Sequence, residues 1–194
     1  MTALSTAAPR RAIHTRRIAF QSFLREDGLW DIDCELVDTK AIAVPLLERD
    51  VLPPGEPLHH IRVRLTIDEG LTVRAAEAAA AAAPFGECRQ SVALPVQRLV
   101  GLTMGTGWRK AIDAAMGGEG GCTHVRELVF NAATAAFQTI PHYLETAGGS
   151  RKPDLSQVTQ PPFYVGQCMT WAFDGAVAHR QVPQFARPRP STKD

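Results

Sequence analysis

Several common signatures are missing from this sequence of 194 residues. It contains no G-x-G-x-x-G, no phosphate-binding P-loop, no G-x-S-x-G and no H-E-x-x-H. These motifs mark dinucleotide enzymes, nucleoside triphosphatases, α/β-hydrolases and zinc proteases. Their absence predicts that the chain uses no nucleotide cofactor and belongs to none of the common hydrolase classes. The sequence also has no internal repeat.

Long apolar runs and an excess of one charge are missing as well. No apolar run reaches the ~18 residues of a membrane helix, and Ala3–Ala8 is too short for an export signal. The formal net charge is +1, and the basic cluster formed by Arg10, Arg11, Arg16 and Arg17 is short. We therefore expect a cytoplasmic protein that binds neither nucleic acid nor a membrane, with four reduced cysteines.

What is present fits one domain with decorated ends. We expect a disordered arm over 1–11, a single domain over 12–184 and a disordered tail over 185–194. Alternation of apolar and polar residues predicts strands, and turn residues between them predict three hairpins. The expected hairpins are Ile18–Arg25 with Leu29–Asp38 around a type I′ turn at Asp27-Gly28, Ile61–Ala75 around Glu69-Gly70, and Phe163–Phe173 with Ala176–Val182 around Asp174-Gly175.

The middle of the chain has helical periodicity. The segment Ala75–Ala83 is expected to end a strand and then form a short helix, and Ser91–Met104 and Trp108–Met116 are expected to be helical. The longest helix is expected over Thr123–Ile140, ended by Pro141. Hairpins together with grouped helices predict an α+β fold, in which an antiparallel sheet packs against a block of three helices.

Two of the cysteines, Cys88 and Cys122, stand just before expected helices. The unpaired N–H groups at a helix start stabilise a thiolate and can lower the thiol pKa from ~8.5 to about 3.5–7.5. Cys122, which follows a glycine-rich turn, is therefore the strongest candidate for a reactive or metal-binding thiol. Cys34 shares an apolar strand face and is expected in the core, while the role of Cys168 stays open.

Three histidines are candidate partners of these thiols. His124 follows Cys122 by two residues, and the pair can converge only if Cys122 lies outside the first helical turn. His59 and His60 begin a strand and point to opposite faces, with His59 on the core side. Cys and His around a tetrahedral ion is ordinary zinc chemistry.

Part of the chain, Leu58–Tyr143, resembles the NifU-like, IscU-like iron–sulfur scaffold family. The likeness lies in the hairpin with Asp68-Glu69-Gly70, in Gly86-Glu87-Cys88, and in Gly121-Cys122-Thr123-His124 before an alanine-rich helix. It implies a scaffold-like core over about 58–143 in which Cys88 and Cys122 stand where two cluster ligands stand. The family's first cysteine is replaced near His59 and His60, and the histidine before its third cysteine is Gly121.

The whole chain more closely resembles a bacterial family known as domain of unknown function 2889. The matching residues are His14-x-Arg16, Arg25–Ile32, Asp38-Thr39-Lys40 and Gly121–His124. This second resemblance extends to both outer hairpins and implies no activity.

Three hypotheses follow for function, and the sequence leaves open whether the chain is an enzyme. The first is a metal-binding protein that holds zinc or an iron–sulfur cluster through His59, His60, Cys88 and Cys122. The second is an enzyme for a small molecule, with Cys122 as nucleophile or acid–base and His124 or His60 as its partner. The third is a non-catalytic binding module. A small molecule or metal ion is the expected ligand, and a homodimer is compatible with the sequence.

Overall fold

The computed structural model describes residues 4–48, 50–146, 148–150 and 152–188. The chain divides into two compact units, 1–142 and 143–194, and each is described by itself. This division falls inside the 12–184 span that was expected to be one domain. The arm expected over 1–11 and the tail expected over 185–194 extend beyond the described residues, and residues 4–13 contain no helix or strand.

The first unit is built on a four-stranded antiparallel sheet with the order β1-β2-β3-β4. Each strand pairs with its neighbour in the sequence, so the sheet is a simple meander. The α+β class and the antiparallel sheet are thereby confirmed. The strands are β1 (His14–Leu24), β2 (Trp30–Lys40), β3 (Pro57–Ile67) and β4 (Val73–Ala82).

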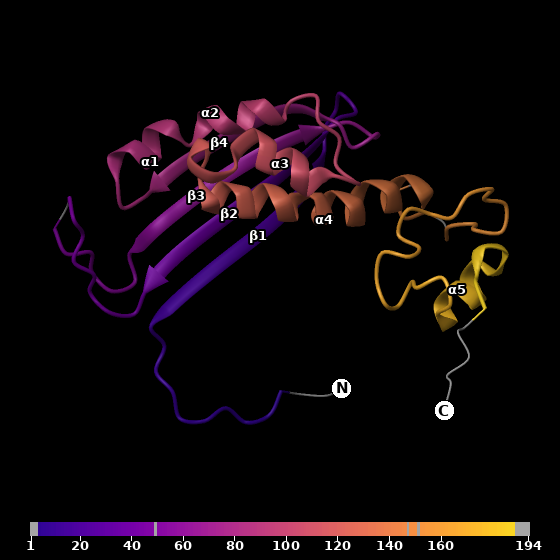
Figure 1. Ribbon diagram of the computed structural model, residues 1–194, viewed down its shortest axis with the longest axis horizontal. Coiled ribbons are helices and arrows are strands. Elements are labelled where there is room, and N and C mark those ends of the chain that lie inside the picture. Colours follow the sequence, from indigo (N-terminus) through magenta and orange to yellow (C-terminus); the bar gives the residue numbers. More distant parts are fainter. Residues whose placement is uncertain (1–3, 49, 147, 151, 189–194) are drawn as a thin grey trace. The chain divides into compact units, whose positions relative to one another are not determined.

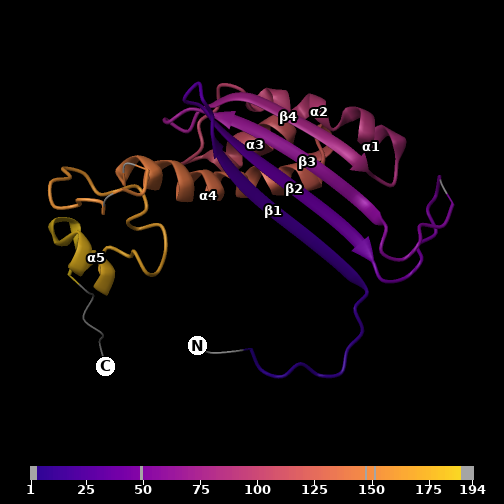
Figure 2. The same cartoon turned by 180° about the vertical axis from the view of Figure 1, so that it is seen from behind.

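One face of this sheet is apolar and covered by helices, and the other is polar and open. Figures 1 and 2 show the helices of the first unit on a single side of the sheet. Strand β2 sets the pattern, because alternate side chains starting at Trp30 are buried while Asp31, Asp33 and Glu35 face the open side. The covered face contributes Trp30, Ile32, Cys34, Leu36, Ile61, Val63, Leu65, Ile67 and Val73 to the main core.

The helical part of the first unit is more broken than expected. Its elements are α1 (Gly86–Ser91), α2 (Ala93–Val96), a 3-10 turn (Gln97–Leu99), α3 (Trp108–Met116), a second 3-10 turn (Gly118–Gly120) and α4 (Thr123–Glu145). The helices α3 and α4 agree with the expected segments, apart from the end of α4. The structure does not contain the expected block of three continuous helices.

Three helical expectations are wrong. The single helix expected over Ser91–Met104 is interrupted near Pro95, which has no N–H to bond the carbonyl of Ser91. The helix α4 continues four residues past Pro141, because one proline removes a single backbone bond from a long packed helix. The alanine run ending at Ala82 stays in β4, since pairing with β3 outweighs the helical preference of alanine.

The first hairpin closes with a loop different from the expected two-residue turn. The N–H of Arg25 bonds the carbonyl of Leu29, and the N–H of Gly28 bonds the carbonyl of Arg25. This is a three-residue loop in which Gly28 has a φ of +82°, the left-handed conformation that glycine adopts readily. The Asp27-Gly28 signal therefore located the turn correctly but not its type.

The second unit contains no strand among its described residues, so the hairpin expected over Phe163–Val182 is wrong. Its helical elements are α5 (Ala176–Gln181) and a 3-10 turn (Pro183–Phe185). Gly166 has a φ of +82°, which breaks the expected strand, and Gly175 starts α5 instead of turning a hairpin. The unit packs around a small core of Val165, Ala178 and Val182. No helix of the described residues is long and apolar enough to cross a membrane.

Candidate functional site

The candidate site lies on the covered face, at the end of the sheet where β1 and β3 begin and β2 ends. The strand register places Arg16, Asp38 and His59 side by side in one row across these three strands. The beginning of α4 approaches the same row, because Arg16 donates a hydrogen bond to Glu127 at 2.7 Å. Four elements that are distant in the sequence therefore meet at one carboxylate, Asp38.

Asp38 is buried because it continues the apolar alternation of β2. Only 2% of Asp38 is exposed, and four hydrogen bonds satisfy its carboxylate. Arg16 donates to both of its oxygens at 2.8 Å, His14 pairs with Oδ1 at 3.0 Å, and His59 pairs with Oδ2 at 3.1 Å. Burial alone would raise the pKa of Asp38, but the hydrogen bonds and charge of Arg16 and the histidines hold that pKa well below its usual range.

Cys122 lies at the start of α4, one residue before the helix begins. Its carbonyl accepts the N–H of Arg126, as expected for the residue that caps a helix. Because Cys122 stands outside the first turn, its side chain converges with His124, and Sγ lies 3.7 Å from Nδ1. The preceding Gly121 passes so close to Met116 that a Cβ at position 121 would lie 2.5 Å from the Met116 carbonyl oxygen.

The local environment favours the thiolate form of Cys122. Burial of the thiol opposes ionisation, but the hydrogen bond with His124 and the backbone N–H groups of Val125 and His124 outweigh it. The net effect is a pKa of Cys122 below that of an ordinary thiol. The contrast with Cys34 is clear, because burial and the charge of Asp33 raise the pKa of Cys34 to about 12.

His124 connects the thiol to the buried carboxylate. Its Nε2 lies 3.9 Å from Oδ2 of Asp38, and its ring packs on the ring of His59 with centroids 4.1 Å apart. Burial is the largest influence on His59 and lowers its pKa despite the neighbouring carboxylate. The order of groups is therefore thiol, imidazole and carboxylate, which is the arrangement that activates a cysteine nucleophile.

The same groups offer ligand atoms for a metal ion. One oxygen of Asp38 and one ring nitrogen each of His59 and His124 lie within 4.8 Å of one another. The group consists of three residues, and no cysteine is among them.

The other candidates from the sequence lie elsewhere or point away. His60 faces the open side of the sheet and pairs with Glu35 at 2.7 Å. Cys88 is exposed inside the short helix α1, instead of preceding a long helix. Cys34 is buried in the core, and Cys168 is exposed in the second unit. The structure therefore brings together Cys122, His124 and His59.

Sequence reasoning missed the four residues that complete the site, which are His14, Arg16, Asp38 and Glu127. A signal for Asp38 was present, because a carboxylate that continues an apolar alternation must be buried with partners. The first expected hairpin began only at Ile18, which left His14 and Arg16 outside the strands, although residues two apart share one face of a strand. Glu127 carried no comparable signal, since its partner is 111 positions away.

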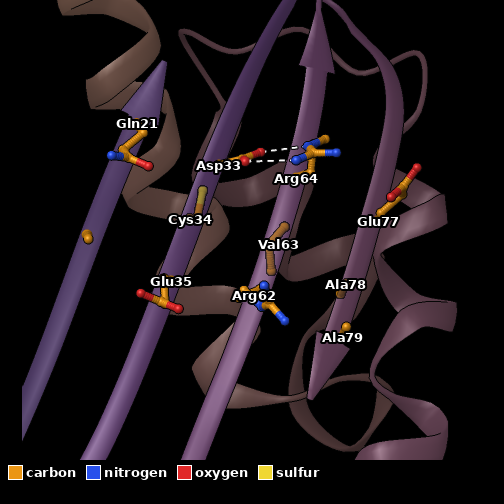
Figure 3. A pocket seen from close by; sticks show the side chains of 11 residues that line it. Gln21, Asp33, Cys34, Glu35, Arg62, Val63, Arg64, Glu77, Ala78 and Ala79 are labelled. Carbon is orange, nitrogen blue, oxygen red and sulfur yellow. Dashed lines mark hydrogen bonds and ion pairs between the residues drawn. The ribbon is translucent and has the colours of Figure 1, made fainter. Parts of the chain in front are cut away.

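The open face of the sheet has a hollow of about 480 Å³. Figure 3 shows its charged side chains in rows across the strands, with Arg64 paired to Asp33. Glu35, Arg62 and Glu77 also line it. The thiol in its lining, Cys34, is buried and has a pKa raised to about 12, so this hollow lacks the low-pKa thiol found at Cys122.

Comparisons with known proteins give a family but no activity. No curated protein and no solved structure matches the sequence. A family model matches residues 14–138, a range that begins at His14 and includes every residue of the site described above. The chain belongs to the family described as "Protein of unknown function (DUF2889)".

Proposed function

We propose that the chain is a cysteine-dependent enzyme in which the Cys122 thiolate attacks an electrophilic carbon of its substrate. The observation that carries this proposal is the approach of Cys122 Sγ to His124 Nδ1 at 3.7 Å, with Nε2 of the same ring facing Asp38. His124 holds the thiol proton and returns it to the leaving group. The buried carboxylate of Asp38 supplies a negative charge 3.9 Å from Nε2 of this ring.

The bonding of Asp38 supports this role over a metal role. A carboxylate has about four acceptor sites, and Asp38 already accepts two hydrogen bonds from Arg16 and one each from His14 and His59. An Arg16 guanidinium in a two-point contact also repels a cation. Because these four bonds fill the carboxylate, Asp38 lies beside the His124 ring at 3.9 Å without a hydrogen bond to it, a contact that needs no free acceptor site.

The reactivity of Cys122 tests the proposal directly. In a Cys88→Ser, Cys168→Ser background only Cys34 and Cys122 remain. Limiting iodoacetamide near neutral pH is expected to alkylate Cys122, located by peptide mass spectrometry, and to leave Cys34 unmodified until the protein is unfolded. Alkylation of Cys122 that requires unfolding would contradict the proposal.

An acyl-transfer test follows from the same chemistry. With p-nitrophenyl acetate, the thiolate attacks the carbonyl carbon, p-nitrophenolate leaves, and an acetyl thioester forms on Cys122. We expect a burst of p-nitrophenolate and one acetyl group on Cys122, and we expect neither in Cys122→Ser. Absence of both the burst and selective alkylation would favour a non-catalytic binding module.

A metal site is the second candidate, supported by the 4.8 Å grouping of Asp38, His59 and His124. Two imidazoles and a carboxylate suit zinc with an open position. An iron–sulfur cluster is bound by thiolates, and the exposed Cys88 offers this grouping no support. The likeness to the scaffold family therefore stays a proposal, which anaerobic reconstitution with iron and sulfide would test.

Metal analysis separates the two candidates. If zinc binds, protein purified without chelator contains about one zinc per chain, and His59→Gln loses it. His60→Gln is the matched control, because His60 lies on the other face and pairs with Glu35. If the zinc content is the same in His59→Gln and in His60→Gln as in the natural chain, the metal site is rejected. We place the protein in the cytoplasm, a proposal consistent with its unpaired cysteines.

A further inference from the structure

A groove runs between the edge strand β1 and the helix α4, and it begins beside the candidate site. Its volume is about 700 Å³. Ile18, Phe20 and Ser22 line it from β1, and Asn131, Thr134, Ala135, Gln138 and Thr139 line it from α4. Figures 1 and 2 show α4 beside β1 on the covered side of the sheet.

Two contacts bound this groove along its length. At one end Arg16 pairs with Glu127, and at the other Thr139 donates a hydrogen bond to Ser22 at 3.0 Å. Six strand residues at ~3.3 Å each, or twelve helix residues at ~1.5 Å each, give a length of about 18–20 Å. Cys122 lies five residues before Glu127, about 8 Å further along the axis of α4.

The backbone of β1 presents hydrogen-bonding groups to this groove. The bonds from Ala41 N–H to the Ile13 carbonyl and from Arg25 N–H to the Leu29 carbonyl fix the register at both ends of the hairpin. In this register the odd-numbered residues of β1 pair with β2. The N–H and C=O groups of Ile18, Phe20 and Ser22 therefore point to the outer edge, and no hydrogen bond from another described strand reaches them.

We propose that an extended peptide segment occupies this groove as an added fifth strand along β1. Unpaired backbone groups on an edge strand are the element that peptide strands recognise by addition. The apolar side chains of Ile18 and Phe20 receive alternate side chains of the peptide, while Asn131 and Gln138 offer polar contacts above it. The unpaired backbone groups and polar rim match a peptide better than an alkyl chain, which offers no hydrogen bonds.

The inference rests on the proposed function in one respect, since the peptide strand leads its next residues toward Cys122. It therefore names the substrate class as a peptide or a peptide-borne group. Binding itself does not require the thiol, so it can be measured in Cys122→Ser. Loss of thiol reactivity and loss of peptide binding are then separate outcomes.

The probe is a phage-displayed library of random twelve-residue peptides, selected on the immobilised full chain carrying Cys122→Ser. Enriched sequences are synthesised with a fluorophore and titrated by anisotropy. We expect micromolar binding that Ala135→Trp weakens at least tenfold by filling the groove. Ala79→Trp, in the hollow of the open face, is the matched control and is expected to change nothing.

A second pair of variants tests the backbone contact if Ala135→Trp disturbs folding. Both Ser22→Pro and Ser22→Ala remove the hydroxyl contact with Thr139. Only proline also removes the outward N–H, while the bonds to β2 remain. Ser22→Pro is expected to bind the peptide about fivefold to tenfold more weakly than Ser22→Ala, as for one lost hydrogen bond.

Three results would overturn the inference. The first is a library that yields no peptide, and the second is binding that survives both Ala135→Trp and Ser22→Pro. The third is a dimer in sedimentation experiments that Ser22→Pro dissociates, because β1 would then pair with a second copy of the chain.

Discussion

Two carboxylates on the same strand, Asp38 and Asp33, have the same kind of partner in opposite surroundings. Each accepts a two-point contact from an arginine on a neighbouring strand, Arg16 for Asp38 and Arg64 for Asp33. The side chain of Asp38 is 2% exposed on the covered face, whereas that of Asp33 is 34% exposed on the open face. The pairing is alike, and the burial differs.

The difference shows why only one of these pairs builds a site. Water screens the pair on the open face, so each group there behaves almost independently. On the covered face, the charge of Asp38 must be balanced by the groups that touch it, which ties His14, Arg16 and His59 into one network. The thiol of Cys122 meets this network through His124, which contacts Sγ with Nδ1 and lies 3.9 Å from Asp38 with Nε2.

The largest effect is expected when the buried carboxylate loses its charge. Asp38→Asn is expected to lower the free energy of unfolding by about 2–3 kcal/mol, because it breaks a buried network and leaves donors without an anion. Arg16 is one-third exposed and keeps Glu127, which limits the loss. Urea unfolding followed by circular dichroism measures it, and a loss below about 1 kcal/mol would contradict the buried role.

The stability that Asp38 contributes is also expected to depend on pH. The pKa of Asp38 is lower in the folded chain than the ~3.9 of an unfolded one, so its contribution to stability is complete above about pH 5. That contribution is lost as the pH falls toward the folded pKa, with a slope of up to about 1.4 kcal/mol per pH unit. Urea midpoints measured from pH 6 to about pH 3 are expected to fall less steeply in Asp38→Asn than in the natural chain. Equal slopes would show that Asp38 is not stabilised as an anion.

The next largest effect is expected on the reactivity of the Cys122 thiol. His124→Gln removes the imidazole that lowers the pKa of Cys122, so the rate of alkylation of Cys122 near neutral pH is expected to fall about tenfold. The rate should rise again at higher pH as the thiol ionises without help. His60→Gln, on the open face, serves as the control and is expected to leave the rate unchanged. An unchanged rate in His124→Gln would show that His124 does not control the reactivity of Cys122.

The smallest effect is expected on the open face. Asp33→Asn removes a solvated ion pair with Arg64 and is expected to cost about 0.5 kcal/mol. Raising the salt concentration should shrink that difference further, since the pair is screened. A cost comparable to that of Asp38→Asn would remove the distinction between the two faces.

Local patterns in the sequence were sufficient to predict most of the sheet. The alternation from Trp30 to Leu36 and from Ile61 to Ile67 placed both central strands correctly, because each has one buried face. Local sequence patterns failed where pairing with another strand decides whether a segment becomes a strand. The alanine run of β4 is a strand because β3 pairs with it, whereas the alternation from Phe163 finds no partner strand among the described residues and is not a strand.

The site could be predicted only in part for the same reason. A helix start is a local feature, and it pointed to Cys122 and His124. The strand register that brings Arg16, Asp38 and His59 into one row is a property of three strands together. No single segment carries that information.

The missing side chain at Gly121 has a consequence for how the protein can change. A Cβ at position 121 would lie 2.5 Å from the carbonyl oxygen of Met116, so any other residue forces the chain to shift next to Cys122. We expect Gly121→Ala to displace Cys122 from His124 and to slow the alkylation of Cys122, although no reacting atom is replaced. In this variant the thiol, the imidazole and the carboxylate are all still present, so a loss of reactivity would come from their changed positions alone.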